Sequence, residues 1–253
     1  DYDITVLFPR SILKFRKQPV PQEAGMKMRI LWTLPFQEKN RLIYLLSCML
    51  NAGVLSEFKK HNLIFIGYPV YARHILYTDK TKVIYDCMDY YELLYPDQKR
   101  VAKVIAWENQ LIQKCDLLLA TSSYLKRKAD EIAGNSKSCL IRNAPSIKNI
   151  FLPKLPQKKE RYEICYIGTI SEWFDYDTIM YSLDKCDNIF YTLIGPAEKR
   201  IEHQRVSYKG VIKHAELGTE IGDVDCLVMP FQITPLVEAV DPVELYEYIA
   251  FGK

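Results

Sequence analysis

Short runs of apolar and β-branched residues alternate with helix-length amphipathic stretches along most of the chain. This alternation limits the possible folds more than any other feature, because it is typical of a parallel sheet that is covered by helices. The sequence therefore predicts an α/β protein. In the first half we expect strands at 4–8, 28–33, 63–67, 82–86, 117–121 and 138–141, and helices at 40–59, 71–78, 99–114 and 123–133.

A stretch rich in proline and charge interrupts the alternation at 152–160, and it has no helical or strand periodicity. Such a composition is typical of an interdomain linker. We therefore expect an N-terminal domain at 1–152, a linker at 153–161 and a C-terminal domain at 162–253. In the C-terminal domain, strands are expected at 163–168, 189–194, 205–209 and 226–229, and helices at 176–183, 215–221 and 242–250.

The chain begins directly before a predicted strand and stops at the end of a predicted helix, where a further strand is expected. We therefore expect a fragment, truncated at both ends, of a longer protein. Its 253 residues, of which 49% are hydrophobic, are enough for one large α/β domain or two small ones.

The 34 Lys and Arg residues against 31 Asp and Glu give a net charge of +3, which is weak evidence for any partner. A nucleic-acid binder usually has a denser basic stripe, so no nucleic-acid partner is expected. Basic clusters at 14–17, 126–128 and 158–161 are typical of solvated faces, and the alternative is attraction to anionic lipid or to a lipid-pyrophosphate acceptor. The apolar run at 42–55 is too short to span a bilayer and predicts a buried helix.

Seven cysteines and four histidines are scattered along the chain without the spacing of a metal site. The cysteines are odd in number, none forms a CxxC pair, and most lie inside apolar runs. This pattern predicts reduced, buried thiols and a cytoplasmic protein. The histidines, which we expect to be structural or solvated, are His61, His74, His203 and His214.

Two predicted strands in the second half end in glycine, at Gly168 and at Gly195. In an open parallel sheet, ligands bind beyond the carboxyl ends of the strands, and a glycine there lets a ligand approach the backbone. A plain turn between a strand and a helix explains Gly168 equally well. Because both glycines are expected on the same edge of one sheet, together they favour a ligand site.

The last predicted helix has well-defined ends. Asp241 suits the N-cap, Pro242 suits the first helical position and Gly252 suits the C-terminal cap. The free N–H groups of the first turn would form an anion site suited to a pyrophosphate. Glu244 and Glu247 lie on one face, where a carboxylate could accept two hydrogen bonds from a ribose diol. A capped surface helix with solvated glutamates is an equally good interpretation.

Two carboxylates, Asp86 and Asp89, come at the end of the predicted strand 82–86. We expect them to face the cleft between the domains, where such acids can bind an acceptor hydroxyl or act as a base. Turn formation and helix capping by aspartate is the alternative explanation.

In their order along the chain, these segments resemble the group 1 (family 4) glycosyltransferases, which have the GT-B fold. The resemblance is to bacterial members that build capsule, exopolysaccharide or teichuronic-type cell-wall polymers, and it runs from about Leu63 to Lys253. Each motif alone is modest evidence, whereas the ordered series is specific. The motifs are 85–89, 107–108, 115–116, 120–122, 142–144, 166–170 with Trp173 and Asp175, 193–196, 225–231 and 241–253.

The resemblance implies two facing Rossmann-like domains, the second of which binds most of a nucleotide-sugar donor. It implies that Glu247 binds the donor ribose, that N–H groups of the helix beginning at Pro242 meet the diphosphate, and that the base lies near 210–211. It implies no cofactor and no bound metal, because a helix dipole and basic side chains take the diphosphate's charge. The expected donor-binding residues are Gly168, Thr169, Gly195, Gly210, Val211, Asp241, Pro242, Val243, Glu244 and Glu247, and the expected catalytic residues are Asp86 and Asp89.

The function that the resemblance implies is transfer of a hexosyl unit from a nucleotide sugar, most often a UDP-sugar, to a glycan or lipid-linked acceptor with retention of configuration. The expected partners are the donor, the acceptor and the inner face of the membrane, to which a cytoplasmic enzyme would bind peripherally. Two alternatives stay open. One is a non-catalytic GT-B-like subunit that supports a partner transferase, and the other is a nucleotide-sugar 2-epimerase.

The chain departs from the family pattern in three places. Glu244 stands where relatives often carry lysine, so one positive charge expected at the diphosphate is missing. The family's pair of acids is imperfect, because Glu247 is matched by Ala239 and Glu238 is displaced by one residue. The glycine-rich loop that follows the family's first strand is absent. The first departure slightly favours a non-catalytic subunit.

Overall fold

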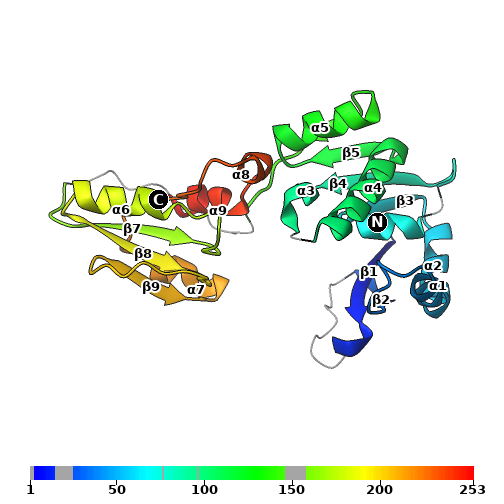
Figure 1. The fold of residues 1–253 in the computed structure, drawn as a ribbon, viewed down its shortest axis with the longest axis horizontal. Coiled ribbons are helices and arrows are strands. Elements are labelled where there is room, and N and C mark those ends of the chain that lie inside the picture. The colour runs from blue at the N-terminus through cyan, green and yellow to red at the C-terminus, as the bar shows by residue number, and fades with distance from the viewer. Residues whose placement is uncertain (1–2, 15–24, 76, 96, 146–157) are drawn as a thin grey trace. The chain divides into compact units, whose positions relative to one another are not determined.

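The computed structural model describes residues 3–14, 25–75, 77–95, 97–145 and 158–253, and the chain divides into two compact units, unit 1 at 1–141 and unit 2 at 142–253. Both units are built from parallel strands and helices (Figure 1). The predicted α/β class is therefore confirmed. The predicted linker at 153–161 falls largely outside the described residues.

The main sheet of unit 1 has four parallel strands in the order β3-β4-β5-β6, and these are Leu63–Ile66, Lys82–Cys87, Leu117–Ala120 and Ser138–Leu140. The segments between them are the 3-10 helix η3 and the helices α3, α4 and α5, which span Pro69–His74, Tyr91–Leu94, Gln98–Lys114 and Ser123–Ala133. Ser122 caps α5 by accepting from the Leu125 N–H group at 3.1 Å. The predicted helix at 71–78 is wrong in type, since Pro69 starts a short 3-10 turn there.

A second, two-stranded parallel sheet pairs β1 (Ile4–Ser11) with β2 (Met26–Thr33). A 3-10 turn, η1 (Ile12–Lys14), follows β1. After β2 come α1 (Arg41–Leu50), α2 (Ala52–Leu55) and the 3-10 helix η2 (Ser56–Lys59).

Asn51, which is 1% exposed, holds these helices to β2. Its amide oxygen accepts from the Trp32 N–H at 2.8 Å, and its amide nitrogen donates to the Trp32 carbonyl at 2.8 Å. The two bonds satisfy the backbone of β2 at its edge, which a buried polar group must do to be tolerated.

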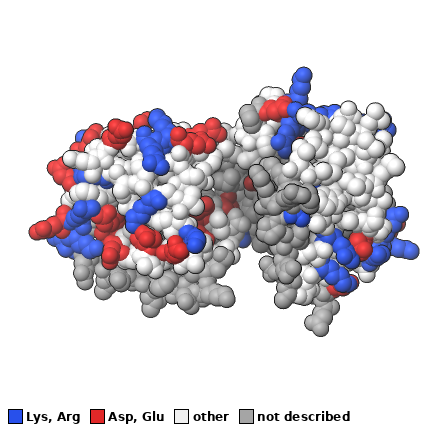
Figure 2. All heavy atoms as spheres, turned by 90° about the horizontal axis from the view of Figure 1, so that it is seen from below, with Lys and Arg blue, Asp and Glu red and all other residues white. Residues whose placement is uncertain are grey.

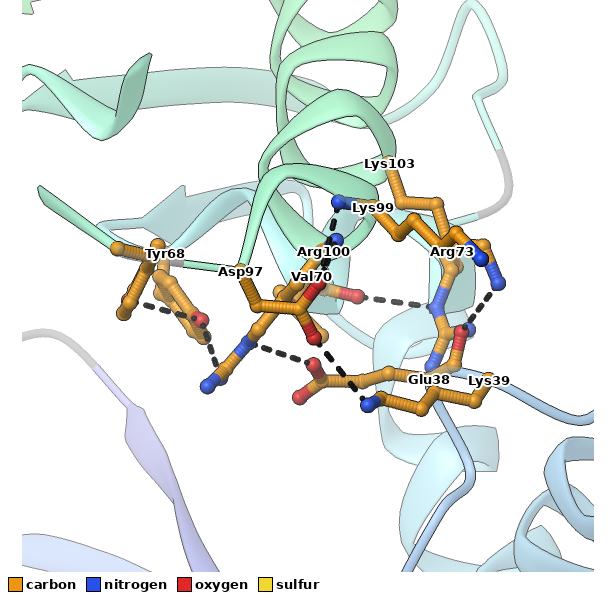
Figure 3. A network of polar contacts seen from close by, with 10 residues as sticks. Glu38, Lys39, Tyr68, Val70, Arg73, Asp97, Lys99, Arg100 and Lys103 are labelled. Carbon is orange, nitrogen blue, oxygen red and sulfur yellow. Dashed lines mark hydrogen bonds and ion pairs between the residues drawn. The ribbon is translucent and has the colours of Figure 1, made fainter. Parts of the chain in front are cut away.

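A network of polar contacts joins the turn before α1 to the start of α4 (Figure 3). Lys39 Nζ lies 3.2 Å from Asp97 Oδ2, and Arg100 Nε lies 3.1 Å from Glu38 Oε2. Lys103 Nζ donates to the Glu38 carbonyl at 3.3 Å. Asp97 also caps α4, so one carboxylate links two elements that are far apart in sequence.

The exposed face of α1 contradicts the prediction of a buried helix at 42–55. Ser47 is the only buried residue that α1 contributes, and its hydroxyl donates to the Trp32 carbonyl at 3.3 Å. The polar side therefore faces β2, and the apolar side is exposed; its residues are Leu42, Leu45, Leu46, Met49 and Leu50. Over the described part of the chain, no single helix is long and apolar enough to cross a membrane, although α1 together with 52–59 would pass by length and composition with a 76° bend.

Unit 2 has one sheet of four parallel strands in the order β10-β7-β8-β9, and these are Cys226–Leu227, Tyr162–Ile167, Ile189–Ile194 and Val206–Gly210. Helix α6 (Tyr176–Lys185) packs on one face, where Ile179 and Leu183 meet Tyr166 and Leu193. The other face is covered by α7 (His214–Glu220) and α9 (Val243–Phe251). A short helix, α8 (Pro235–Ala239), precedes α9.

All seven cysteines are free thiols, and Cys87, Cys115 and Cys165 are buried as the apolar runs predict. The prediction of burial is wrong for Cys139, Cys186 and Cys226, which are exposed. Cys139 and Cys226 lie in the short strands β6 and β10, and Cys186 directly follows α6, so an apolar sequence context does not secure burial at these positions.

Candidate functional site

The carboxyl ends of three neighbouring strands of unit 2 carry glycines that lie side by side. The Gly168 N–H donates to the Ile194 carbonyl at 2.9 Å, and the Gly195 N–H donates to the Gly210 carbonyl at 2.8 Å. The three glycines lie in a row because β7, β8 and β9 are neighbouring parallel strands, whose carboxyl ends meet at the same edge of the sheet. Sequence reasoning placed all three glycines at a ligand site, and the structure brings them to one edge.

Gly195 is required by the packing of this edge. Its φ is 137°, and a Cβ built there would lie 1.9 Å from the Gly168 carbonyl oxygen. No other residue fits so close to a neighbouring backbone. Gly210 differs, because its φ is 68° and no atom lies within 4 Å of a built Cβ. Val211, which follows it, is exposed, so the end of β9 is open where the base was expected.

Helix α9 does not begin as the sequence predicts. Its N-cap is Pro242, and Asp241 makes no capping bond. The Asp241 carboxylate instead accepts from Arg142 Nη1 at 2.8 Å, from the Asn143 N–H at 2.8 Å and from the Tyr246 hydroxyl at 2.9 Å. The carboxylate is bonded to these donors and not to the first N–H groups of α9, so the cap assignment of Asp241 is wrong. They also tie 142–143 to unit 2, which explains why the division between the units falls before the predicted boundary at 152.

The first turn of α9 has no side-chain cap. Because the first N–H groups of any helix lack a carbonyl partner within it, those of Val243 and Glu244 remain available to an anion. Tyr248 fixes α9 beside the end of β7, since its hydroxyl donates to the Ile167 carbonyl at 2.9 Å and accepts from the Ile167 N–H at 2.8 Å. An anion bound at the start of α9 can therefore lie close to the carboxyl ends of β7, β8 and β9, where the three glycines are.

Glu247 lies on a face of α9 that is mostly shielded from solvent, since only 13% of its side chain is exposed. Its Oε1 atom lies 2.9 Å from Nε2 of His214, the first residue of α7. Sequence reasoning assigned His214 no role at the site. The signal was its position four residues after Gly210, in the loop where the donor base was expected.

Unit 1 carries the two acids that were predicted to be catalytic. Asp86 lies near the end of β4 and Asp89 follows it. Burial raises the pKa of both carboxyl groups, and a hydrogen bond with Tyr91 partly offsets the rise for Asp89. A raised pKa suits a carboxyl group that takes up a proton. That either acid faces a donor stays a prediction.

A third acid, Glu108 of α4, is 2% exposed and was expected only as part of a motif. Its Oε1 accepts from the Tyr85 hydroxyl at 2.8 Å, and Oε2 is buried without a hydrogen-bond partner. Burial raises the pKa of Glu108, while the Tyr85 bond opposes the rise. The Glu108 carboxyl group therefore binds β4 through Tyr85 in the interior of unit 1 and does not reach solvent.

Among the described residues, no group of three or more His, Cys, Asp and Glu side chains could hold a metal ion. A hollow at the amino ends of β8 and β9 is lined by Asp187, Phe190, Gln204 and Arg205. Arg205 there is already bound to the carbonyls of Leu183 and Cys186, so the hollow offers no unused cation. Figure 2 shows acidic and basic side chains interspersed over the visible face of unit 2.

No protein-family model matches the chain. A curated relative from Bacillus subtilis strain 168, TuaH, is 24% identical over 196 residues, which is 68% of this chain and 49% of the relative. It is provisionally named a teichuronic acid biosynthesis glycosyltransferase. The chain thus spans about half the length of this relative.

Solved structures agree in fold. Sucrose-phosphate synthase from Thermosynechococcus elongatus matches with a TM-score of 0.60 and 15% identity, over 86% of this chain and 64% of its own. The chain has the fold of the GT-B glycosyltransferases. Anabaena HepE, solved in complex with UDP and glucose, matches with a TM-score of 0.54 and 14% identity, over 80% of this chain and 60% of its own. An Escherichia coli trehalose-6-phosphate protein bound to UDP-2-fluoro glucose matches with a TM-score of 0.60 and 12% identity, over 98% of this chain and 75% of its own.

These structural matches establish the fold, and they confirm the resemblance to GT-B glycosyltransferases that the motifs indicate.

Proposed function

We propose that the protein is a glycosyltransferase and that unit 2 binds its nucleotide-sugar donor, a UDP-sugar. The observations that support the proposal are the glycine strand ends that lie side by side in unit 2, the start of α9 without a side-chain cap, and the Glu247 carboxylate beside His214 in the segment that follows Gly210. Glycosyltransferases of the same fold, such as HepE, have been solved with UDP and glucose bound.

The diphosphate would lie against the first turn of α9. The N–H groups of Val243 and Glu244 can donate to phosphate oxygens, and the helix dipole adds about half a positive charge at this end. Gly168 and Thr169 would lie on the other side of the sugar phosphate, and Thr169 is exposed, so a ligand can approach it.

Arg142 offsets the negative charge that Asp241 places beside the proposed anion site. A carboxylate at Asp241, directly before the anion site, would repel a diphosphate unless its charge were balanced. Arg142 balances it with an ion pair at 2.8 Å, and half of the Arg142 side chain remains exposed to solvent. The paired Asp241 therefore belongs to the support of the site, and Pro242 sets where the N–H groups begin.

Glu247 would bind the ribose, and the open backbone at 210–211 would lie near the base. A ribose hydroxyl is a donor and a carboxylate oxygen is an acceptor, so the chemistry of the pair is complementary. Gly195 would shape the floor of the site by holding β8 against Gly168.

In the reaction, the acceptor oxygen would bond to the anomeric carbon while the bond from that carbon to the diphosphate oxygen breaks. The hydroxyl proton would pass to a carboxylate of unit 1, at Asp86 or Asp89, or to the departing diphosphate. We propose a glycan or lipid-linked acceptor, retention of configuration, a cytoplasmic location and peripheral binding to the inner face of the membrane, all on the strength of the family resemblance. TuaH, with its provisional assignment to teichuronic acid biosynthesis, supports a cell-wall polymer as the acceptor.

A non-catalytic partner subunit is the second candidate, and the observation that favours it is Glu244 at the diphosphate end of α9. Donor hydrolysis separates the two. The full-length protein is incubated with UDP-hexoses without acceptor, and free sugar and UDP are measured. Slow release of both that is lost in an Asp86→Asn/Asp89→Asn double variant supports the transferase. UDP binding with no release in the presence of any acceptor tested supports the subunit.

A further inference from the structure

A contact between α7 and α9 links a histidine to the carboxylate of the proposed donor site. His214 Nε2 lies 2.9 Å from Glu247 Oε1. The His214 side chain is 52% exposed and the Glu247 side chain is 13% exposed, so the histidine reaches inward from the surface to a carboxylate that is largely covered.

The direction of the hydrogen bond follows from the chemistry of the two groups. An ionised carboxylate can only accept, so Nε2 carries the proton and donates. Oε1 is then held by the imidazole, and among the described residues no group donates to Oε2. Of the two carboxylate oxygens, one is fixed by the protein and the other is available to a ligand.

The helices do not need this contact in order to pack. Leu217 and Ile221, in and directly after α7, share one apolar cluster with Tyr248 and Phe251 of α9. Tyr248 also binds both backbone groups of Ile167. The His214–Glu247 contact lies outside this apolar cluster, so the packing of the two helices does not depend on it. The contact therefore has an effect mainly on where the Glu247 carboxylate points.

We propose that His214 is a positioning residue for donor recognition, which holds Glu247 Oε1 so that Oε2 faces a ribose hydroxyl of the nucleoside diphosphate. This inference rests on the proposed function. Without His214, the Glu247 side chain must be ordered when the ligand binds, and immobilising one such side chain weakens binding about two- to tenfold. The loss acts on the hydroxyl contact and leaves the base and phosphate contacts unchanged.

The test compares UDP with 2′-deoxy-UDP and 3′-deoxy-UDP by calorimetric titration of the full-length protein. His214→Ala should weaken UDP binding about two- to tenfold and reduce the preference for UDP over the deoxy analogue whose missing hydroxyl Glu247 recognises. His214→Gln should restore most of that preference, because the Gln amide nitrogen can donate from nearly the position of Nε2. His203→Ala is the matched control, since His203 belongs to the same unit and its ring Nδ1 accepts from the Arg205 N–H at 3.1 Å, before β9 begins.

A double-mutant cycle decides between positioning and a direct or purely structural role. If His214 acts through Glu247, then His214→Ala causes no further loss in a Glu247→Gln background. Equal losses in both backgrounds, or equal weakening of UDP and of both deoxy analogues, would overturn the inference. Failure of the wild type to bind UDP would instead reject the proposed function, and unchanged binding by Glu247→Gln alone would reject the ribose assignment on which His214 depends.

Discussion

Replacing Gly195 by alanine should destabilise unit 2 strongly, although the change adds a single methyl group. The new Cβ would stand 1.9 Å from the Gly168 carbonyl oxygen, a separation at which β7 and β8 must move apart at their carboxyl ends. The φ of 137° adds a second cost, because L-residues rarely adopt it.

The magnitude combines these two costs. A residue held in such a backbone region costs about 1–3 kcal/mol. Forcing an extra group into a packed region costs about 1–3 kcal/mol more. We therefore expect unit 2 to lose about 2–6 kcal/mol, which is a large part of the roughly 5–15 kcal/mol that stabilises a typical domain.

Urea unfolding followed by tryptophan fluorescence measures the effect in unit 2 alone. Trp173 is the only tryptophan of unit 2, so a background with Trp32 and Trp107 replaced by phenylalanine isolates its signal. Gly218→Ala in α7 is the control, because the nearest atom to its built Cβ is 3.9 Å away and alanine is the better helix former by about 1 kcal/mol. An unfolding midpoint for the Gly195 variant equal to that of the wild type would refute the reasoning.

Three other changes test the buried polar groups. Glu108→Gln should alter the pH dependence of unit 1: burial raises the pKa of Glu108, so its stabilising contribution is complete below about pH 4 and is lost as the pH rises through the folded-state pKa. Glutamine at position 108 does not titrate, so the unfolding free energy of the variant minus that of the wild type should rise with pH above about 4. A constant difference in urea titrations between about pH 4 and 8 would contradict this expectation. Asp241→Ala should cost about 1–3 kcal/mol in urea unfolding of unit 2, because the Asn143 N–H loses its acceptor; an unchanged midpoint would be the contrary result. Asn51→Ala should cost unit 1 about 1–3 kcal/mol and speed amide exchange at Trp32, and unaltered exchange would speak against the role given to Asn51.

Much of the fold could be predicted because parallel strands buried on both faces are short apolar runs. The strand at 189–194 and the helix at 123–133 have the predicted bounds. The pattern of α1 shows which side is apolar, yet it does not show that this side faces outward. That outcome depends on Asn51 and Ser47, whose bonds to Trp32 turn the polar side inward.

The candidate site was predictable in outline and not in detail. Glycines after strands mark the edge of a sheet, and a helix beginning near Pro242 follows from local sequence. The role of Asp241 depends on Arg142 and Asn143, which lie almost one hundred positions earlier, so local capping rules could not reveal it. His214 was missed for the same reason, since only the packing of α7 against α9 brings it to Glu247.

The central claim, that unit 2 binds a nucleoside diphosphate through α9, is tested most directly by calorimetric titration of the full-length protein with UDP. Losing a charged hydrogen-bond partner costs about 1.5–3 kcal/mol. Glu247→Gln is nearly isosteric, so it should leave thermal unfolding unchanged and weaken UDP binding about tenfold or more. Wild-type protein that binds no UDP, or a variant that binds it with wild-type affinity, would contradict the account.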